Sequence, residues 1–267
     1  MKTIAPLPLD VKLMNALASA LFMLLLLVLL GAGLAYVQRL PQFAIRGVTV
    51  MGDVSHYNAI SLRANVMPRL QGTFFTLDLH AARQVFETMP WVRQAVVKRD
   101  FPNRLKVHLQ EHQAVAFWGV EGDSRLVNSF GEVFEANLGE LEREDLPRLS
   151  GPNGQSAQVL AMLQVLQPRL APMELTLAQL ELTPRGGWRA QLDNNTTLEL
   201  GSGSTDELLA RLDRFLKTVT QATSRYSRTV EQLASVDLRH SDGYAMRLSG
   251  VSTVEAQDMK NVNQGNR

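Results

Sequence analysis

The sequence contains no cysteine among its 267 residues. This absence excludes thiol nucleophiles, disulfide bonds, cysteine-type zinc sites and iron–sulfur clusters. It leaves the redox character of the compartment open, because a chain without thiols is compatible with an oxidising or a reducing environment.

The sequence also lacks an excess of charge of either sign. Lysine and arginine number 27, aspartate and glutamate number 26, and the formal net charge is +1. A surface that binds nucleic acid by its phosphates needs a basic excess, so we do not expect nucleic acid as the main partner.

Two common catalytic signatures are absent. The sequence holds no G-x-S-x-G, and the glycine-rich stretch Gly201–Thr205 lacks the lysine and the spacing of a phosphate-binding loop. We expect that stretch to be a turn that caps a helix. The acidic run Glu142–Asp145 is charged and loop-like, which indicates a solvated connection.

One apparent metal motif is present: His108, Glu111 and His112 spell H-x-x-E-H. This zincin motif requires a helix, where residues i and i+4 lie ~6 Å apart. Here apolar residues recur at every second position, which predicts a strand with the two histidines ~13 Å apart. Two zinc ligands need nitrogens within roughly 4 Å of each other. We therefore expect no zinc site. The expected solvated face holds Lys106, His108, Gln110 and His112, and the expected core face holds Leu105, Val107 and Leu109.

A long apolar run is the clearest positive feature. No charged residue occurs from Leu13 to Gln38, and the 22 residues Ala16–Val37, as a helix, would span ~33 Å against a bilayer core of ~30 Å. The run therefore predicts a membrane-spanning helix. Two alternatives are a buried helix of a soluble protein, and a signal peptide cleaved near the weak site at Ala35. The lysines and arginines flanking the run do not decide its orientation.

A first section after the span, from about Phe43 to Glu111, predicts the order β-α-α-β-β. A strand is expected at Ile45–Gly52, and a helix at Ala59–Leu70. A second helix should follow Asp78 as its cap. A hairpin then turns at Phe101–Asn103, and its second strand is expected to run from Arg104 to Trp118.

A second section from Ala114 predicts a β-rich domain. Its strand candidates are AVAFWGV, RLVNSFGEVFE, QLELTPRGGWRAQLD, TTLELG and SVDLRHSDGYAMRL. Two helices are expected, Gln155–Leu170, shortened by Pro168, and Thr205–Thr223, capped at Ser204 or Thr205. Residues 251–267 are polar and predicted to be a disordered tail.

The order of these elements resembles the bacterial division protein family FtsQ/DivIB over nearly the whole chain. PWVRQAVVKRDFPNRLKVHLQEHQAVAFW (90–118) is similar to the run through the end of that family's POTRA module. The segments LVNSFGEVF (126–134), LPRLSGP (146–152), GGWRAQLDN (186–194) and SVDLRHSDGYAMRL (235–248) also resemble it. The chain departs from the pattern at His240, where tyrosine is usual, and at Asp193–Asn195, a turn that a glycine often closes.

The resemblance implies an α+β protein: a cytoplasmic arm (1–12), a transmembrane helix (13–38), a POTRA domain (43–113), a β domain (114–250) and the tail. It implies a non-enzymatic scaffold of the divisome without cofactors. The scaffold would sit in the inner membrane with its C-terminal part in the periplasm. Its implied partners are FtsB and FtsL, with FtsK, FtsW and the septal peptidoglycan synthase as further components.

The resemblance also implies a partner-binding surface late in the β domain. The residues that match it are Arg239, His240, Ser241, Asp242, Gly243, Tyr244 and Ala245. A nearly terminal strand can be a sheet edge, to which a partner adds a strand of its own. Without the resemblance, Ser241–Gly243 would be a simple hairpin turn and Tyr244 a core residue.

Two other classes of protein remain as alternatives. A single-POTRA envelope chaperone is one, although such proteins usually carry several POTRA modules and a barrel. A membrane-tethered hydrolase is the other, although it would need a nucleophile, a base and an electrophilic site that converge.

Overall fold

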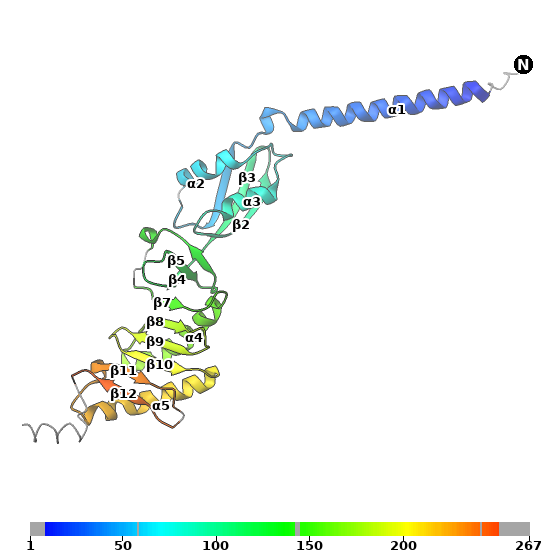
Figure 1. The fold of residues 1–267 in the computed structure, drawn as a ribbon. Helices are drawn as coiled ribbons and strands as arrows, with labels where there is room; N and C mark the ends of the chain where they lie inside the picture. Colours follow the sequence, from blue (N-terminus) through cyan, green and yellow to red (C-terminus); the bar gives the residue numbers. More distant parts are fainter. Residues whose placement is uncertain (1–8, 58, 142–144, 241, 251–267) are drawn as a thin grey trace, which may run out of the picture. The chain divides into compact units, whose positions relative to one another are not determined.

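The computed structural model describes residues 9–57, 59–141, 145–240 and 242–250. By contacts along the chain it forms two units, Met1–His112 and Gln113–Arg267. The elements of both units are labelled in Figure 1.

Helix α1 (Leu9–Gln38) is the candidate membrane span of the described chain. An 18-residue window within Asp10–Gln38 has a mean hydropathy of 2.6, and none of that window is buried against protein. The apolar side chains from Leu13 to Val37 are exposed on all sides, as expected of a helix that lipid surrounds. The arm predicted at 1–12 falls mainly on residues outside the described chain.

The first unit contains the predicted β-α-α-β-β order. Its three-stranded sheet has the order β1-β3-β2, with β1 parallel and β2 antiparallel to β3. The bounds are β1 Gly47–Asp53, α2 Ala59–Val66, α3 Leu79–Glu87, β2 Val92–Asp100 and β3 Arg104–Glu111. Short 3-10 turns cover Pro41–Phe43 (η1) and Met67–Arg69 (η2).

The core of the first unit follows from the alternation along β3, which is alternately exposed and buried from Arg104 to Glu111. Leu105, Val107 and Leu109 are at most 1% exposed, and they meet side chains of both helices, including Phe86 at 1%. Asp78 caps α3, as predicted, by accepting hydrogen bonds from the backbone N–H groups of His80 and Ala81.

The second unit is built on one sheet of nine strands, in the order β12-β11-β10-β9-β8-β7-β4-β5-β6. The bounds are β4 Ala114–Trp118, β5 Arg125–Asn128, β6 Val133–Glu135, β7 Arg148–Ser150, β8 Leu177–Leu182, β9 Trp188–Leu192, β10 Thr197–Gly201, β11 Leu233–Asp237 and β12 Ala245–Leu248. The 3-10 turns of this unit are η3 Leu138–Glu140, η4 Ala171–Met173 and η5 Val230–Gln232.

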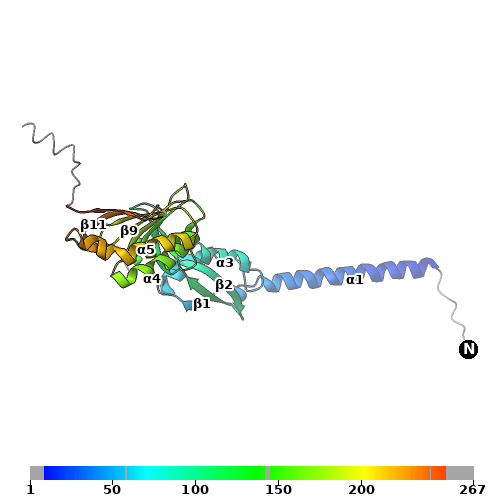
Figure 2. The ribbon, with the colours of Figure 1, turned by 90° about the horizontal axis from the view of Figure 1, so that it is seen from below.

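Helices α4 (Ser156–Leu170) and α5 (Thr205–Ser224) cover the same face of this sheet (Figure 2). The apolar stripe predicted on the second helix is confirmed, because Leu208, Leu212 and Phe215 are at most 1% exposed. Ser204 and Glu207 form a capping box at the start of α5, which satisfies two N–H groups that a helix end leaves without partners. On the other face, β8, β9 and β10 carry the polar side chains Glu181, Arg189 and Glu199.

The structure corrects the strand predicted from Arg104 to Trp118. The run divides at His112–Gln113 into β3 and β4, which belong to different sheets. The backbone N–H of His112 donates to the carbonyl of Trp91 at 2.8 Å, and β4 then pairs with β5 and β7. Period-two patterning cannot reveal this division, since both parts are strands.

Three smaller expectations also differ. The helix expected at Ala59–Leu70 ends at Val66 and continues as η2. Pro168 does not shorten α4, because Leu166 and Leu170 on either side of it are both buried and packing holds the last turn. Strand β7 was not predicted; it has three residues, too few for a periodic pattern.

Candidate partner-binding edge of the sheet

The predicted binding segment lies at one end of the nine-stranded sheet. Strand β12 is the terminal strand, and within the described chain it pairs only with β11, in antiparallel register. The partners across the ladder are Leu233 with Leu248, Val236 with Met246 and Asp237 with Ala245. Backbone groups on the outer side of such a strand are open to another chain.

The structure places the seven predicted residues around the β11–β12 connection. Arg239 and His240 are exposed and follow β11, Asp242 is exposed, and Ala245 is the exposed first residue of β12. Gly243 and Tyr244 are half-buried just before the strand, and Ser241 lies outside the described residues.

Tyr244 points to α5. Its ring meets Phe215 edge-to-face, with the centroids 5.2 Å apart and an angle of 89° between the planes. Its hydroxyl oxygen lies 2.8 Å from Oγ1 of Thr218. Tyr244 therefore fixes the start of β12 to the helix, which is the packing role that the sequence alone favoured, and only part of its ring is open to a partner.

Gly243 is not required by the fold. A Cβ atom built on it meets no atom within 4 Å, and its φ lies outside the left-handed region where glycine is favoured. The space beside Gly243 is thus open in the described chain, and a side chain placed there would enter it.

Arg239 is held by Asp237 at the end of β11. Its Nη2 donates to Oδ2 of Asp237 at 2.5 Å, and its Nε donates to Oδ1 at 2.9 Å. These hydrogen bonds lower the pKa of Asp237 to about 2, against an ordinary value of 3.8. The side chain of Arg239 is held in this way while it remains exposed.

A row of charged side chains continues from this pair across the polar face of the sheet. In register, Asp237 lies beside Glu199 of β10, Glu199 beside Arg189 of β9, and Arg189 beside Glu181 of β8. Nε of Arg189 is 2.6 Å from Glu199, and its Nη1 is 3.5 Å from Glu181. The hydrogen bond to Glu199 raises the pKa of Arg189. These pairs keep the face highly polar next to the edge.

The prediction omitted most of β12 itself. Arg247 is exposed and lies opposite Ser235, whereas Met246 packs partly on the core and Leu248 is buried. The alternation in AMRL was visible in the sequence, and it would have indicated that Ala245 and Arg247 share the face away from the helices.

The H-x-x-E-H residues do not form a metal centre. His108 is exposed, and Glu111 is buried on the opposite face of β3. Glu111 accepts hydrogen bonds from the backbone and hydroxyl of Ser55, and its Oε2 lies 2.8 Å from Nδ1 of His56. The ring of His56 stacks on Trp91 with centroids 3.8 Å apart. No group of three or more potential metal ligands occurs among the residues that the structure describes.

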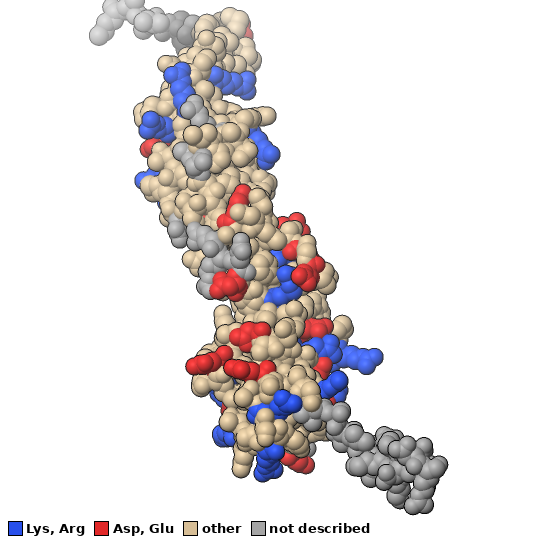
Figure 3. All heavy atoms as spheres, turned by 90° about the vertical axis from the view of Figure 1, so that its left-hand side faces the viewer, with Lys and Arg blue, Asp and Glu red and all other residues tan. Residues whose placement is uncertain are grey.

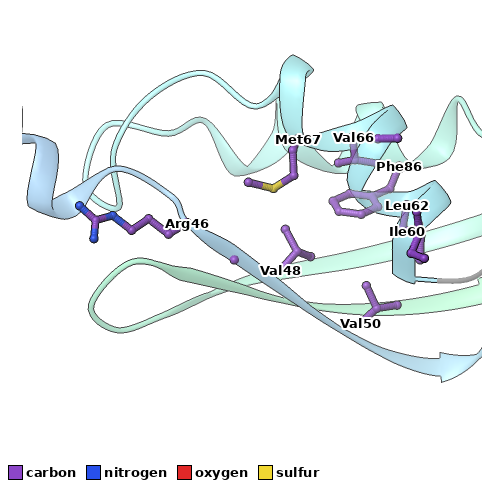
Figure 4. Close-up of a pocket in the computed structure, with 10 residues that line it drawn as sticks. Arg46, Val48, Val50, Ile60, Leu62, Val66, Met67 and Phe86 are labelled. Atoms are coloured by element: carbon purple, nitrogen blue, oxygen red, sulfur yellow. The ribbon is translucent and has the colours of Figure 1, made fainter.

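The first unit has a separate apolar groove of about 710 Å³ between β1 and α2 (Figure 4). Val48 and Val50 of β1 line one side, Leu62 and Met67 the other, and Phe86 of α3 lies between them. Strand β1 is itself a sheet edge, so the groove lies beside an open edge of the described sheet.

Two families match successive parts of the chain. The POTRA domain, FtsQ-type, matches residues 43–112, and Cell division protein FtsQ/DivIB, C-terminal, matches residues 116–239. The protein named Cell division protein FtsQ of Thiomonas arsenitoxydans is 40% identical over 255 residues, covering 94% of this chain and 93% of the relative. The protein of that name from Burkholderia pseudomallei is 40% identical over 243 residues, covering 91% and 94%. With a POTRA unit, a nine-stranded β unit and relatives matched over nearly their full length, this chain belongs to the FtsQ family of bacterial cell division proteins.

Proposed function

We propose that this chain is a non-enzymatic scaffold of the divisome that binds FtsB and FtsL by strand addition at β12. The observation that carries the proposal is the position of β12 as a terminal strand of the nine-stranded sheet, which has β6 at its other end. A partner segment paired with its outer side would gain backbone hydrogen bonds, and the alternating side chains Ala245 and Arg247 would supply selectivity.

The surroundings of the edge support this role. Gly243 leaves open space in which a partner backbone can approach closely. Tyr244 and Leu248 anchor the two ends of β12 to the core, so the strand is held in place before a partner arrives. A preformed edge lowers the entropy cost of binding. Links to FtsK, FtsW and the septal peptidoglycan synthase would then be made by other surfaces of the assembly.

The test is the affinity of the full chain, in detergent, for FtsB and FtsL before and after Gly243→Asp. The substitution puts a charged side chain into the space that the partner strand would use, and we expect affinity to fall at least tenfold, about 1.4 kcal/mol. Gly139→Asp is the control, because Gly139 is an exposed glycine of the same unit and a Cβ built on it meets only Oδ1 of Asn137, at an ordinary contact distance of 3.5 Å. Equal affinity of both folded variants and the original chain would refute strand addition at β12.

We propose a single-pass arrangement in the inner membrane, with the N-terminus in the cytoplasm and both units in the periplasm. The support is one candidate span near the N-terminus and membership of the FtsQ family. Since the chain has no cysteine, a single Glu121→Cys variant reports its side of the membrane. A membrane-impermeant thiol reagent should label this cysteine in cells whose inner membrane is intact. If the cysteine were labelled only after that membrane is broken, the orientation would be the opposite of the one proposed.

The groove beside β1 favours one alternative, a chaperone that captures extended apolar segments at its POTRA unit. Such a protein should bind unfolded envelope polypeptides, and Val50→Asp in the groove should abolish that binding while leaving FtsB affinity unchanged.

A further inference from the structure

Four phenylalanines gather at one end of the first unit, outside its core. Phe43 meets Phe75 with ring centroids 5.0 Å apart, Phe75 meets Phe74 at 5.2 Å, and Phe74 meets Phe101 at 5.6 Å. All three contacts are edge-to-face, the geometry that aromatic pairs prefer. Phe101 is nevertheless 72% exposed and Phe75 44% exposed, so the cluster presents apolar surface outward.

Backbone hydrogen bonds unite the three segments that carry these rings. The N–H of Phe74 donates to the carbonyl of Phe43 at 2.7 Å, and the N–H of Arg46 donates to the carbonyl of Asn103 at 2.9 Å. Nε of Arg99 donates to the carbonyl of Phe74 at 2.6 Å. Exposed apolar side chains on a backbone tied in this way form a fixed surface and not the tips of loose loops.

This surface is tethered closely to the candidate membrane span. Helix α1 ends at Gln38, and Phe43 follows five residues later, a distance of roughly 18 Å even for a fully extended chain. Oγ1 of Thr73 also donates to the carbonyl of Gln38 at 2.6 Å. Whichever side of the membrane the unit occupies, the aromatic surface stays near the lipid headgroups of that leaflet.

The charge around the cluster suits those headgroups. Arg39, Arg46, Arg99 and Arg104 are exposed on the same three segments, which carry one acidic residue, Asp100. Residues 39–112 as a whole carry ten lysines and arginines and five acidic residues. Basic side chains are spread over this unit in the view of Figure 3. Basic residues beside a span attract anionic lipid, and apolar rings among them enter the interface.

We propose that Phe43, Phe74, Phe75 and Phe101 form a membrane-docking surface, which seats the POTRA unit on a bilayer containing anionic phospholipid. Phe75 and Phe101 enter the interfacial layer, and the surrounding arginines contact lipid phosphates. The short stretch between Gln38 and Phe43 alone would leave the unit free to rotate relative to the membrane. Two attachment points, the span and the aromatic surface, restrict its orientation. The inference depends on α1 as a membrane anchor and not on partner binding at β12.

The test uses the full chain reconstituted in mixed bilayers of phosphatidylcholine and phosphatidylglycerol. A nitroxide is attached to Phe101→Cys, or to the control Val96→Cys, which is an exposed position of β2 five residues earlier, roughly 16 Å away along the strand. We expect oxygen, which concentrates in lipid, to accelerate the spin relaxation of the label at 101 more than a water-soluble nickel complex does. At position 96 the nickel complex should have the larger effect.

Two further arms make the outcome decisive. Adding Phe75→Ser to the chain labelled at 101 should move that label toward water, and replacing phosphatidylglycerol by phosphatidylcholine should do so in part. Circular dichroism confirms that each variant is folded. A label at 101 that is as water-exposed as the one at 96 would overturn the proposal. Protection of that label from both relaxing agents would overturn it too, since it would indicate contact with protein.

Discussion

Tyr244, at the entrance of the terminal strand, packs edge-to-face on Phe215 of α5, with ring centroids 5.2 Å apart. The contact couples the proposed binding edge to the core helix, because Phe215 is fully buried between α5 and the sheet. A residue that the family resemblance implies for partner binding thus holds its own strand first, and we expect any effect of Tyr244 on binding to act through the position of β12.

Tyr244→Ala should weaken both stability and binding. Loss of a half-buried ring is expected to cost roughly 1–2 kcal/mol in the free energy of unfolding. Tyr244→Phe keeps the ring and loses only the hydrogen bond to Thr218, so it should cost at most about 1 kcal/mol. Denaturant unfolding and FtsB affinity, measured on the same samples, check this. If Tyr244→Phe abolished binding without changing stability, the hydroxyl itself would contact the partner.

Glu111→Gln should destabilise the first unit by about 1–3 kcal/mol. The buried carboxylate accepts hydrogen bonds from Ser55 and His56, and an amide would turn an NH₂ group toward those donors. Chemical denaturation of the full chain measures the loss. His108→Ala is the control on the same strand; being exposed, it should leave the unfolding transition unchanged. If Glu111→Gln left the free energy of unfolding unchanged, other contacts would have to hold the loop at Ser55 in place.

Lowering the pH should show how much the ion pair of Asp237 contributes to the stability of the fold. Its pKa is lower in the folded chain than its ordinary value of 3.8, so its ion pair stabilises the fold above pH 3.8. This contribution is lost as pH falls toward about 2, where the folded carboxyl takes up its proton. The effect should be small because the pair is exposed to solvent.

The melting temperature of Asp237→Asn should therefore fall less steeply than that of the original chain between pH 3.8 and about 2. Arg239→Gln removes the hydrogen-bond donor to Asp237, so it should also reduce the dependence of the melting temperature on pH in this range. Unchanged slopes in both variants would show that the pair makes no net contribution to stability.

Zinc should not bind stoichiometrically to His108 and His112. The first lies exposed on β3, and the second follows the strand after the buried Glu111. Metal analysis of the full chain after dialysis against zinc should give the same content for the original and for the double variant His108→Ala, His112→Ala. One equivalent of zinc lost in the double variant would contradict the strand assignment.

Several local features were predictable because they depend on neighbours in sequence. The alternation of Leu105, Val107 and Leu109 predicts a strand and removes the metal motif, as the structure confirms. Caps at Asp78 and Ser204 are likewise confirmed, since the side chain and the N–H groups it serves lie within three residues. In the β9–β10 turn, Asn195 adopts a φ of 64°, which asparagine tolerates better than most residues.

Tertiary structure alone decided the rest. Patterning identified both β3 and β4 as strands and began a second section at Ala114, but it could not show how either strand pairs, because strand pairing depends on hydrogen bonds to distant segments. The same holds for β12, whose place at the edge depends on which strands fill the other eight positions. The partners of Glu111 and Tyr244 lie 55 and 26 residues away. The sequence by itself determined the span, the periodicities and the caps, since these are local; long-range packing determined which strand was left with an open side.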